Sequence, residues 1–137
     1  MKFEIRDPTE AVRDAILAPL TEFNAENGYP ADPASIAITL SEGDAILGGL
    51  WGKTVYDWLF VEYLVIPEIA RGRGLGSRLM AEAERLAVER GCVGAWLTTF
   101  PFQAQRFYEK LGYEAFATLD GSPRDNVRIF MRKTLAL

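Results

Sequence analysis

A glycine-rich turn between an apolar strand and an amphipathic helix constrains the fold more than any other part of this chain. Residues 58–66 are the longest apolar run, and Pro67 after them ends the strand that this run predicts. Apolar residues then recur at helical spacing across 75–90, which predicts a helix with one buried face. The turn at 71–77 joins the two elements and reads Arg-Gly-Arg-Gly-Leu-Gly-Ser. We therefore expect a central strand, a tight turn and a helix in succession.

The residues of this turn are those that a phosphate or pyrophosphate site requires. Glycines let the backbone come close to a ligand, and the first N–H groups of the helix point toward it with the positive end of the helix dipole. Arg71 and Arg73 add two positive charges at the rim. The plainer interpretation, a structural turn with solvated arginines, stays open at this point.

Two common phosphate-binding loops do not fit this turn. A nucleotide-hydrolysing loop ends in Gly-Lys-Ser or Gly-Lys-Thr, whereas Gly76 is followed here by Ser77 and Arg78. A dinucleotide loop needs a third glycine where Ser77 stands, and an acid near the end of the next strand, where the chain has Thr98 and Thr99. The sequence therefore argues against a nucleotide-binding switch protein and against a dinucleotide-binding fold.

Composition excludes further classes of protein and of site. The chain has 137 residues, 49% apolar and 25% charged, with no linker or repeat, so we expect a single domain over 1–137. It lacks histidine and has one cysteine, Cys92, which excludes disulfides, His-based catalytic triads and the usual zinc sites, so no metal is expected. Without a long apolar run or a leader we expect a cytoplasmic protein with no membrane contact. A net charge of −4 argues against nucleic acid as a partner.

The elements expected outside the central unit complete an α/β layer structure. Met1–Arg6 alternates like a first or edge strand, and the following helix is expected to start with Asp7 as its cap and Pro8 as its first residue, then to kink or divide at Pro19. The other strands are expected at 35–40, 45–52, 93–99, 113–119 and 127–135, with a hairpin connection at 53–57, a helix at 102–111 and a turn at 120–123. The alternation predicts a mixed sheet with antiparallel hairpins at each end.

Two motifs together resemble the GNAT superfamily of N-acetyltransferases. Arg71, Gly74 and Gly76 form the spacing R-x-x-G-x-G, which resembles the acetyl-coenzyme A signature of that family. The string 107–113, Phe-Tyr-Glu-Lys-Leu-Gly-Tyr, resembles its closing motif. The resemblance covers nearly the whole chain. It implies a mixed, mostly antiparallel sheet of six to seven strands, flanked by about four helices and splayed at its central strands.

The resemblance also implies a reaction and a cofactor site. A GNAT enzyme transfers the acetyl group of acetyl-coenzyme A (acetyl-CoA) directly to a primary amine, of a small molecule or of a protein terminus or lysine, in a ternary complex. Arg71 would lie beside the coenzyme pyrophosphate, and Gln103 stands where the family often has an asparagine on the pantetheine. The loop amides implied for the pyrophosphate are those of Gly72, Arg73, Gly74, Leu75, Gly76 and Ser77, and the strand residues implied for the pantetheine are Leu64, Val65 and Ile66.

Catalytic roles follow from the same resemblance. Tyr108 matches the family tyrosine that protonates the departing thiolate, and the alternative is a core aromatic residue with a hydrogen-bonded hydroxyl. Glu62 stands where some relatives carry a catalytic glutamate that takes the proton of the amine. For Glu62 the alternatives are a structural acid on a strand edge, or a base role filled by water. A backbone N–H near Val65 is expected to polarise the thioester carbonyl.

Other assignments stay coarser. Cys92 is expected to be an inert core thiol, because it follows Gly91 at the buried start of a predicted strand. Five aromatic residues are candidates for an acceptor pocket, although core packing is the favoured role for each: Phe23, Tyr29, Trp51, Tyr56 and Trp58. Homodimers are common in the family, so the resemblance allows one. The competing function is a catalytically silent acyl-CoA-binding module that keeps the loop and has lost turnover.

Overall fold

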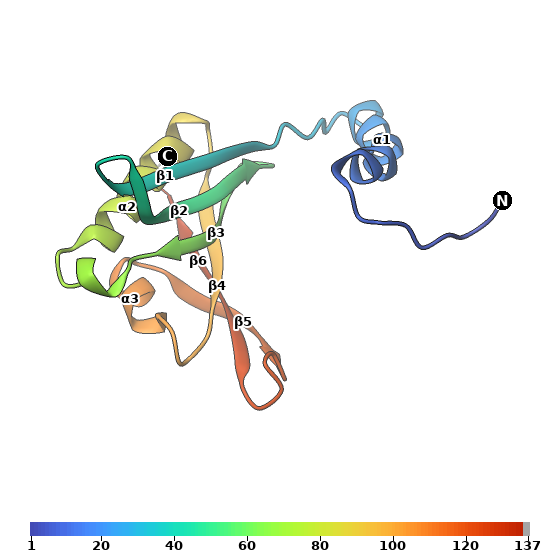
Figure 1. Cartoon of the computed structure of the whole chain (residues 1–137). Helices are drawn as coiled ribbons and strands as arrows, with labels where there is room; N and C mark the ends of the chain where they lie inside the picture. The colour runs from blue at the N-terminus through green and yellow to red at the C-terminus, as the bar shows by residue number, and fades with distance from the viewer. Residues whose placement is uncertain (136–137) are drawn as a thin grey trace. The chain divides into compact units, whose positions relative to one another are not determined.

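The computed structural model describes residues 1–135, so the last two residues of the predicted domain, 136 and 137, lie outside it. The chain forms two compact units, Met1–Asp32 and a second that begins at Pro33 (Figure 1).

The N-terminal unit holds one long helix, α1 (Glu10–Glu26). Its cap is Thr9, whose Oγ1 accepts the N–H of Val12 at 3.2 Å, so the prediction of Asp7 as cap was wrong. Asp7 instead lies before the helix, where its carbonyl accepts the N–H of Thr9 at 2.9 Å. Pro19 lies inside a single uninterrupted helix and does not divide it. The loss of one N–H donor at Pro19 is therefore tolerated within the 17-residue helix.

The strand predicted at Met1–Arg6 is absent, so that prediction was wrong. The segment belongs to no ladder, and its charged residues pair with one another along the chain instead. Lys2 and Arg6 both contact the Glu4 carboxylate, at 2.6 and 3.1 Å. The alternation of apolar and charged residues was a correct strand signal, but the unit Met1–Asp32 contains no second strand that would form a ladder with it.

The second unit is built on one six-stranded sheet in the order β1-β2-β3-β4-β6-β5 (Figure 1). The pair β3–β4 is parallel and the other neighbours are antiparallel, which confirms the predicted mixed sheet. The strands are β1 (Ala34–Glu42), β2 (Ala45–Val55), β3 (Trp58–Val65), β4 (Gly94–Thr99), β5 (Glu114–Asp120) and β6 (Val127–Thr134). The helices are a short 3-10 turn η1 (Glu68–Ala70), α2 (Leu75–Glu89) and α3 (Gln105–Lys110).

Most predicted boundaries agree with these elements to within three residues. The hairpin between β2 and β3 is tighter than predicted, with Tyr56 and Asp57 at its tip at φ of 48° and 67°. Such a two-residue turn matches the twist of the strands and lets β2 continue to Val55. The helix expected at 102–111 is shorter, because residues 101–104 form a turn in which Gln103 N–H donates to Phe100 O at 3.0 Å.

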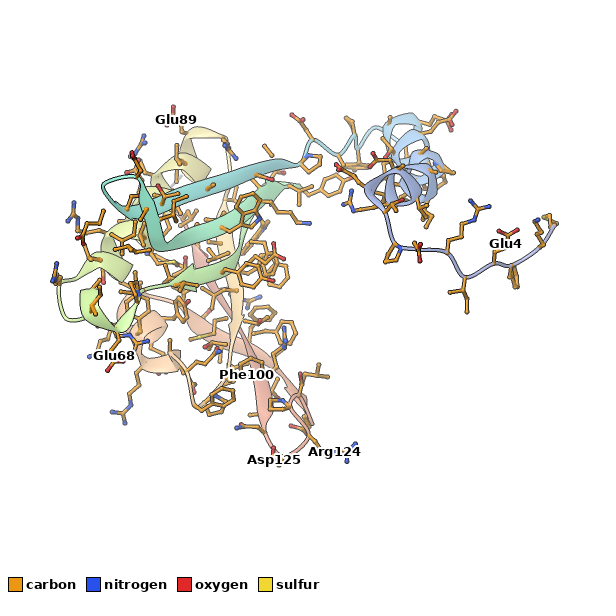
Figure 2. The ribbon with its side chains drawn as sticks, viewed as in Figure 1. Glu4, Glu68, Glu89, Phe100, Arg124 and Asp125 are labelled. Carbon is orange, nitrogen blue, oxygen red and sulfur yellow. The ribbon has the colours of Figure 1, made fainter. Side chains whose placement is uncertain are left out.

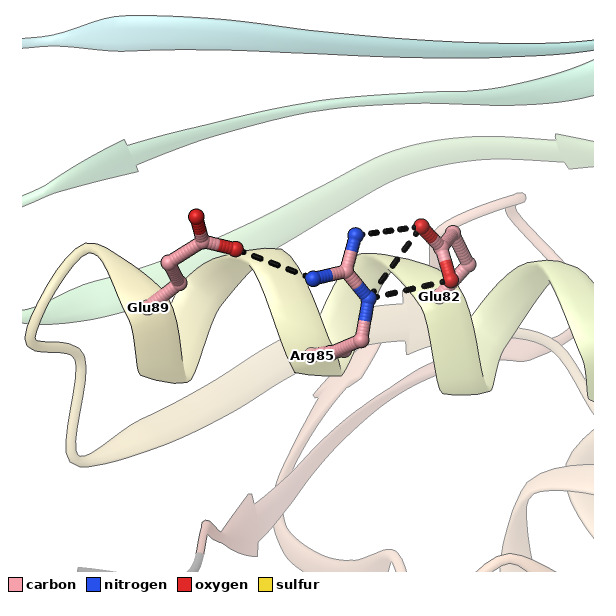
Figure 3. Close-up of polar contacts among 3 residues, drawn as sticks. All are labelled: Glu82, Arg85 and Glu89. Carbon is pink, nitrogen blue, oxygen red and sulfur yellow. Dashed lines mark hydrogen bonds and ion pairs between the residues drawn. The ribbon is translucent and has the colours of Figure 1, made fainter.

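The core lies on one face of the sheet, beneath α2 and α3 (Figure 1). Its fully buried side chains include Leu59, Leu97 and Met131 from three neighbouring strands and Met80 from α2. The opposite side of α2 carries an exposed ion-pair group, in which Arg85 contacts Glu82 at 2.6 Å and Glu89 at 3.0 Å (Figure 3). These exposed pairs contribute little stability, so the buried stripe of α2 positions the helix.

A cluster of three polar side chains joins α2 to β6 and to the residue before β5. The Glu84 carboxylate accepts a hydrogen bond from the Tyr113 hydroxyl at 2.9 Å and contacts Lys133 Nζ at 2.7 Å. The side chain of Glu84 is only 15% exposed, so the charge is held by these two partners. Burial, the nearby Glu84 charge and the hydrogen bond to Glu84 raise the pKa of Tyr113 well above its usual value.

Loss of the Tyr113 hydroxyl is expected to cost about 1–2 kcal/mol of stability, because a partly buried hydrogen bond to a charged acceptor is removed. The substitution is Tyr113→Phe, and the free energy of unfolding is measured by urea denaturation monitored by circular dichroism. The aromatic ring and the Glu84–Lys133 ion pair are retained, so the fold is expected to remain intact. An unchanged unfolding midpoint would show that this hydrogen bond contributes nothing net.

Candidate functional site

The central strands β3 and β4 separate partway along their length and open a groove. They pair only from Trp58–Val61 to Gly94–Leu97, so the β4-facing edge of β3 has no ladder partner beyond Val61. The groove there has a volume of about 920 Å³ and is walled by the free part of β3, the turn at 71–77 and α3. This separation is the splay expected at the central strands. Another hollow, of about 1130 Å³, lies among residues 2–17 and contains no predicted site residue.

A β-bulge shapes the free part of β3. In the register with β2, Tyr63 pairs with Trp51 and Val61 pairs with Gly52, so Glu62 is the extra residue. Its insertion reverses the alternation of the strand: Leu59 and Val61 are buried before it, and the core contacts are made by Leu64 and Ile66 after it. A Cβ on Gly52 would lie 2.5 Å from the Phe60 carbonyl oxygen, so the close approach of β2 requires glycine.

The predicted anion loop lies at the mouth of the groove. Gly72 and Gly74 adopt φ of 79° and 71°, and Gly74 caps α2 without any side-chain hydrogen bond. The first N–H groups of α2 therefore lack a side-chain partner, and the first turn carries no acid. Gly76 is buried, and a Cβ there would lie 3.1 Å from the Phe107 ring, so this glycine lets α3 pack against α2. The loop thus presents free donors and the positive end of a 15-residue helix dipole.

The two loop arginines are held by backbone carbonyls. Arg71 Nε donates to Ile66 O at 3.2 Å, and Arg73 Nη2 donates to Ile69 O at 3.5 Å. Both side chains are exposed and pair with no carboxylate of the part of the chain described here. Arg71 lines the groove, whereas Arg73 does not. Arg71 is therefore the better placed of the two for an anion in the groove.

Tyr108 brings a hydroxyl to the opposite wall. The residue is 8% exposed, lies in α3 and lines the groove. Its ring contacts Phe107 and Tyr113 edge to face, with centroids 5.1 and 5.9 Å apart. No residue of the described chain forms a hydrogen bond with its hydroxyl. Burial raises the pKa of this phenol, so it is protonated at neutral pH. A core tyrosine with a satisfied hydroxyl was the alternative, and the structure does not have that arrangement.

The other predicted residues gather around the same groove. Glu62 is exposed at the bulge, and Gln103 lies in the turn before α3, where its Oε1 accepts from Thr99 Oγ1 at 3.5 Å. The predicted residues that line the groove are Glu62, Leu64, Val65, Ile66, Arg71, Gly72, Gly74, Leu75, Gly76, Ser77, Gln103 and Tyr108. Sequence reasoning missed further lining residues, namely Val61, Tyr63, Ala70, Thr98, Thr99, Phe102, Ala104 and Phe107. A signal was present in Thr98 and Thr99, a polar pair that ends an apolar strand.

Two sequence hypotheses about side chains outside the groove have different outcomes. Cys92 is buried, and its burial, together with the Asp57 charge, raises the pKa of the thiol, as expected for an unreactive core cysteine. Trp51, Tyr56 and Trp58 do not belong to the core of the second unit and do not line the groove. The expected core role was therefore wrong for these three residues, whereas for Phe23 and Tyr29, which belong to the unit Met1–Asp32, it stays a prediction. The Trp58 ring packs instead over Gly94, on the sheet face away from α2. A Cβ on Gly94 would lie 2.5 Å from this ring.

Comparison with known protein families assigns the chain to one of them. The model of the acetyltransferase (GNAT) family matches residues 4–113, which is most of the chain. The chain belongs to the GNAT acetyltransferase family. It is an acyltransferase, with the fold and the turn that the family resemblance implied.

Individual relatives agree with this assignment. The GNAT chain is 41% identical over 96 residues to the blasticidin-S acetyltransferase of Streptomyces morookaense, which covers 68% of this chain and 71% of that protein. A crystal structure of an acetyltransferase from Agrobacterium tumefaciens superposes with a TM-score of 0.88 at 31% identity, over 98% of this chain and all of that one. A streptothricin acetyltransferase from Bacillus anthracis, solved with acetyl coenzyme A, has a TM-score of 0.67 at 26% identity, over 80% of this chain and 68% of that one.

Neither a cluster of metal-ligating side chains nor a membrane-spanning helix is present among the residues that the structure describes. Within residues 1–135, acidic, cysteine and histidine side chains form no cluster of three or more that would hold a metal ion. No helix in that range has the length and apolar character to span a membrane.

Proposed function

We propose that this GNAT acetyltransferase transfers the acetyl group of acetyl-CoA directly to a primary amine in a ternary complex, with 1–137 as one catalytic domain. A single observation carries the proposal. One groove joins a strand edge without a ladder partner, the uncapped start of α2 and the unpartnered hydroxyl of Tyr108. The strand edge can pair with an extended polar chain, the start of α2 can bind a phosphate, and the Tyr108 hydroxyl can donate a proton.

The residues of the groove fit acetyl-CoA, which supplies a thioester as the acetyl donor. The free N–H groups at the start of α2 and the Arg71 guanidinium are suited to the pyrophosphate. The edge of β3 along Leu64, Val65 and Ile66 is suited to the amide-containing pantetheine arm, which would add to it like a strand. The relative solved with acetyl coenzyme A supports the choice of this cofactor.

The chemistry assigned to the chain consists of two proton transfers around one substitution. The amine nitrogen forms a bond to the acetyl carbon as the carbon–sulfur bond breaks. Glu62 takes the first proton of the ammonium, directly or through water, and Tyr108 gives its phenolic proton to the leaving sulfur. The second proton, which the nitrogen loses as the amide forms, passes to solvent. The phenolate that remains regains a proton from solvent. A backbone N–H near Val65 polarises the carbonyl oxygen.

Removal of the Glu62 carboxylate is expected to lower kcat/KM about 10- to 100-fold at pH 7, because the ammonium acceptor then lacks its base. The change is Glu62→Gln, measured as acetyl-CoA-dependent release of free thiol. The loss should shrink as the pH rises toward the amine pKa, because more acceptor is already deprotonated. Glu68→Gln is the control, since Glu68 is also exposed but does not line the groove (Figure 2). A uniform loss at all pH values would contradict the base role.

We propose that the acceptor is a small molecule. The support is the relative named for blasticidin S, which is 41% identical over 68% of this chain, and the streptothricin acetyltransferase among the structural neighbours. The test is a thiol-release assay with a panel of amines that includes blasticidin S, amino acids, polyamines and N-terminal peptides. Turnover of a small-molecule amine and none of a peptide is the expected result. Turnover restricted to peptides would overturn this choice of acceptor.

A further inference from the structure

We propose that Arg128 recognises an anionic group on the acceptor, and that the preferred acceptor is therefore an amine that also carries a carboxylate. This inference rests on the proposed function, because it assigns a substrate class to the acceptor of that reaction. Arg128 lies in β6, and its hydrogen-bond partner Thr98 lines the groove.

The Arg128 guanidinium is fixed but not neutralised. Its Nη1 donates to Thr98 Oγ1 at 3.2 Å, and its Cζ lies 5.1 Å from the centre of the Phe100 ring. The side chain is half-buried, yet no carboxylate within residues 33–135 forms an ion pair with it. A guanidinium carries five N–H donors, so at least one edge is available to a ligand. A partly desolvated cation without a counter-charge gains from an incoming anion.

The neighbouring arginine on the same strand shows that a ring-stacked arginine of β6 does not lack a carboxylate partner as a rule. Arg132 also stacks on an aromatic ring, with its Cζ 5.0 Å from the Phe116 centre. Unlike Arg128, it has a carboxylate partner, Glu114, at 3.9 Å. Within residues 33–135, one of these two stacked arginines therefore has a counter-charge and the other has none.

The position of Arg128 connects it to the groove. Its hydrogen-bond partner Thr98 lines the groove, and so does Phe102, which stacks on Phe100 with ring centres 5.1 Å apart. Phe100 follows the end of β4, where that strand runs toward the β5–β6 hairpin (Figure 2). The guanidinium is thus one hydrogen bond from the groove wall, on the sheet face opposite the buried Leu97.

These contacts define a ligand chemistry. A planar guanidinium matches a carboxylate through two parallel N–H donors, which a single ammonium charge does not offer. The stacked rings of Phe100 and Phe102 beside it favour an apolar or planar body between the amine and the acid. The acceptor class that fits is an amino acid or another amine with both an apolar part and a carboxylate.

The test compares one amine with and without its acid. Phenylalanine and phenylalaninamide are each offered with acetyl-CoA, and kcat/KM is measured by thiol release. Their N-acetyl products are titrated into the protein–CoA complex by calorimetry, so that binding is read even where turnover is slow. We expect the wild-type protein to prefer the acid in both assays, and Arg128→Met to lower this preference about 10- to 100-fold through KM.

Two further variants separate recognition from a structural role. Arg132→Met removes the matched stacked arginine and is expected to leave the acid preference unchanged. Arg128→Lys keeps the charge without the planar fork and is expected to restore part of the preference. Binding of acetyl-CoA should be the same in all three variants, because none of these side chains lines the groove.

The outcomes are distinguishable. If the wild-type protein shows no preference for the acid in either assay, or if Arg128→Met retains it, the inference on Arg128 is wrong while the proposed function stands. If acetyl-CoA itself does not bind, the proposed function is wrong. A preference that falls equally in the Arg128→Met and Arg132→Met proteins would show a general charge effect and would also overturn the inference.

Discussion

Tyr108→Phe is expected to lower kcat by about 100-fold while the Kd for acetyl-CoA changes by less than about twofold. The phenol is the one proton donor that we assign to the departing thiolate, and general acids of this kind contribute on the order of 100-fold or more. The hydroxyl has no hydrogen-bond partner in the described chain, so its removal leaves no protein group unsatisfied. The fold is therefore expected to survive. A thiol-release assay measures kcat, and calorimetry measures the Kd for acetyl-CoA.

The structure offers a matched control for this experiment. Tyr113 is as buried as Tyr108 and its ring contacts that of Tyr108, but its hydroxyl is bonded to Glu84 outside the groove. Tyr113→Phe should therefore lower stability without changing kcat, which is the reverse of the Tyr108 result. An active Tyr108→Phe protein with unchanged kcat would refute the acid role. A protein in which neither variant changes a negligible basal turnover would match the silent acyl-CoA-binding module instead.

Ser77→Glu is expected to weaken acetyl-CoA binding about 10- to 100-fold without loss of stability. Ser77 lies in the first turn of α2 and lines the groove. An acid at this helix position is favourable to the helix, because it interacts with the free N–H groups and the dipole by about 0.3–1 kcal/mol. The same acid repels a pyrophosphate held by those groups, and a repulsion of about 1–3 kcal/mol corresponds to the predicted loss of affinity.

The Ser77→Glu substitution is informative because its expected effects on helix stability and on acetyl-CoA affinity have opposite signs. Ser77→Gln has nearly the same size without the charge, so it should bind acetyl-CoA close to normally. High salt should narrow the difference between the two variants, since added ions screen exposed charges. If Ser77→Glu binds acetyl-CoA as well as Ser77→Gln does at low salt, the start of α2 is not the phosphate site. The turn would then have only a structural role.

The sequence predicted the central part of the fold well because strong local signals coincide there. The apolar run at 58–66, the glycines of the turn and the periodicity of 75–90 all indicate the same strand–turn–helix unit, and the structure confirms it as β3, the turn and α2. The strand prediction that failed rested only on the alternation of apolar and charged residues. Met1–Arg6 alternates like a strand, but a strand needs a partner, and local sequence does not say whether one is present.

The groove was partly predictable for a related reason. The turn and Tyr108 belong to contiguous motifs, so their residues were found from the sequence and then brought together by the fold. The bulge at Glu62 and the lining by Thr98, Thr99 and Phe102 depend on the register between strands that are far apart in the chain. Register is a tertiary property, and no local pattern around these residues encodes it. Arg128 was missed for the same reason, since its contacts come from β4.

The most direct test of the central claim is a calorimetric titration of the wild-type protein with acetyl-CoA, with ATP and NADH as controls. The structure provides an uncapped helix start beside a free strand edge, and we expect both to be used by a ligand that has a pyrophosphate and an extended amide chain. The predicted result is micromolar binding of acetyl-CoA and no comparable binding of ATP or NADH. Absence of acetyl-CoA binding, or equal binding of ATP, would contradict the account.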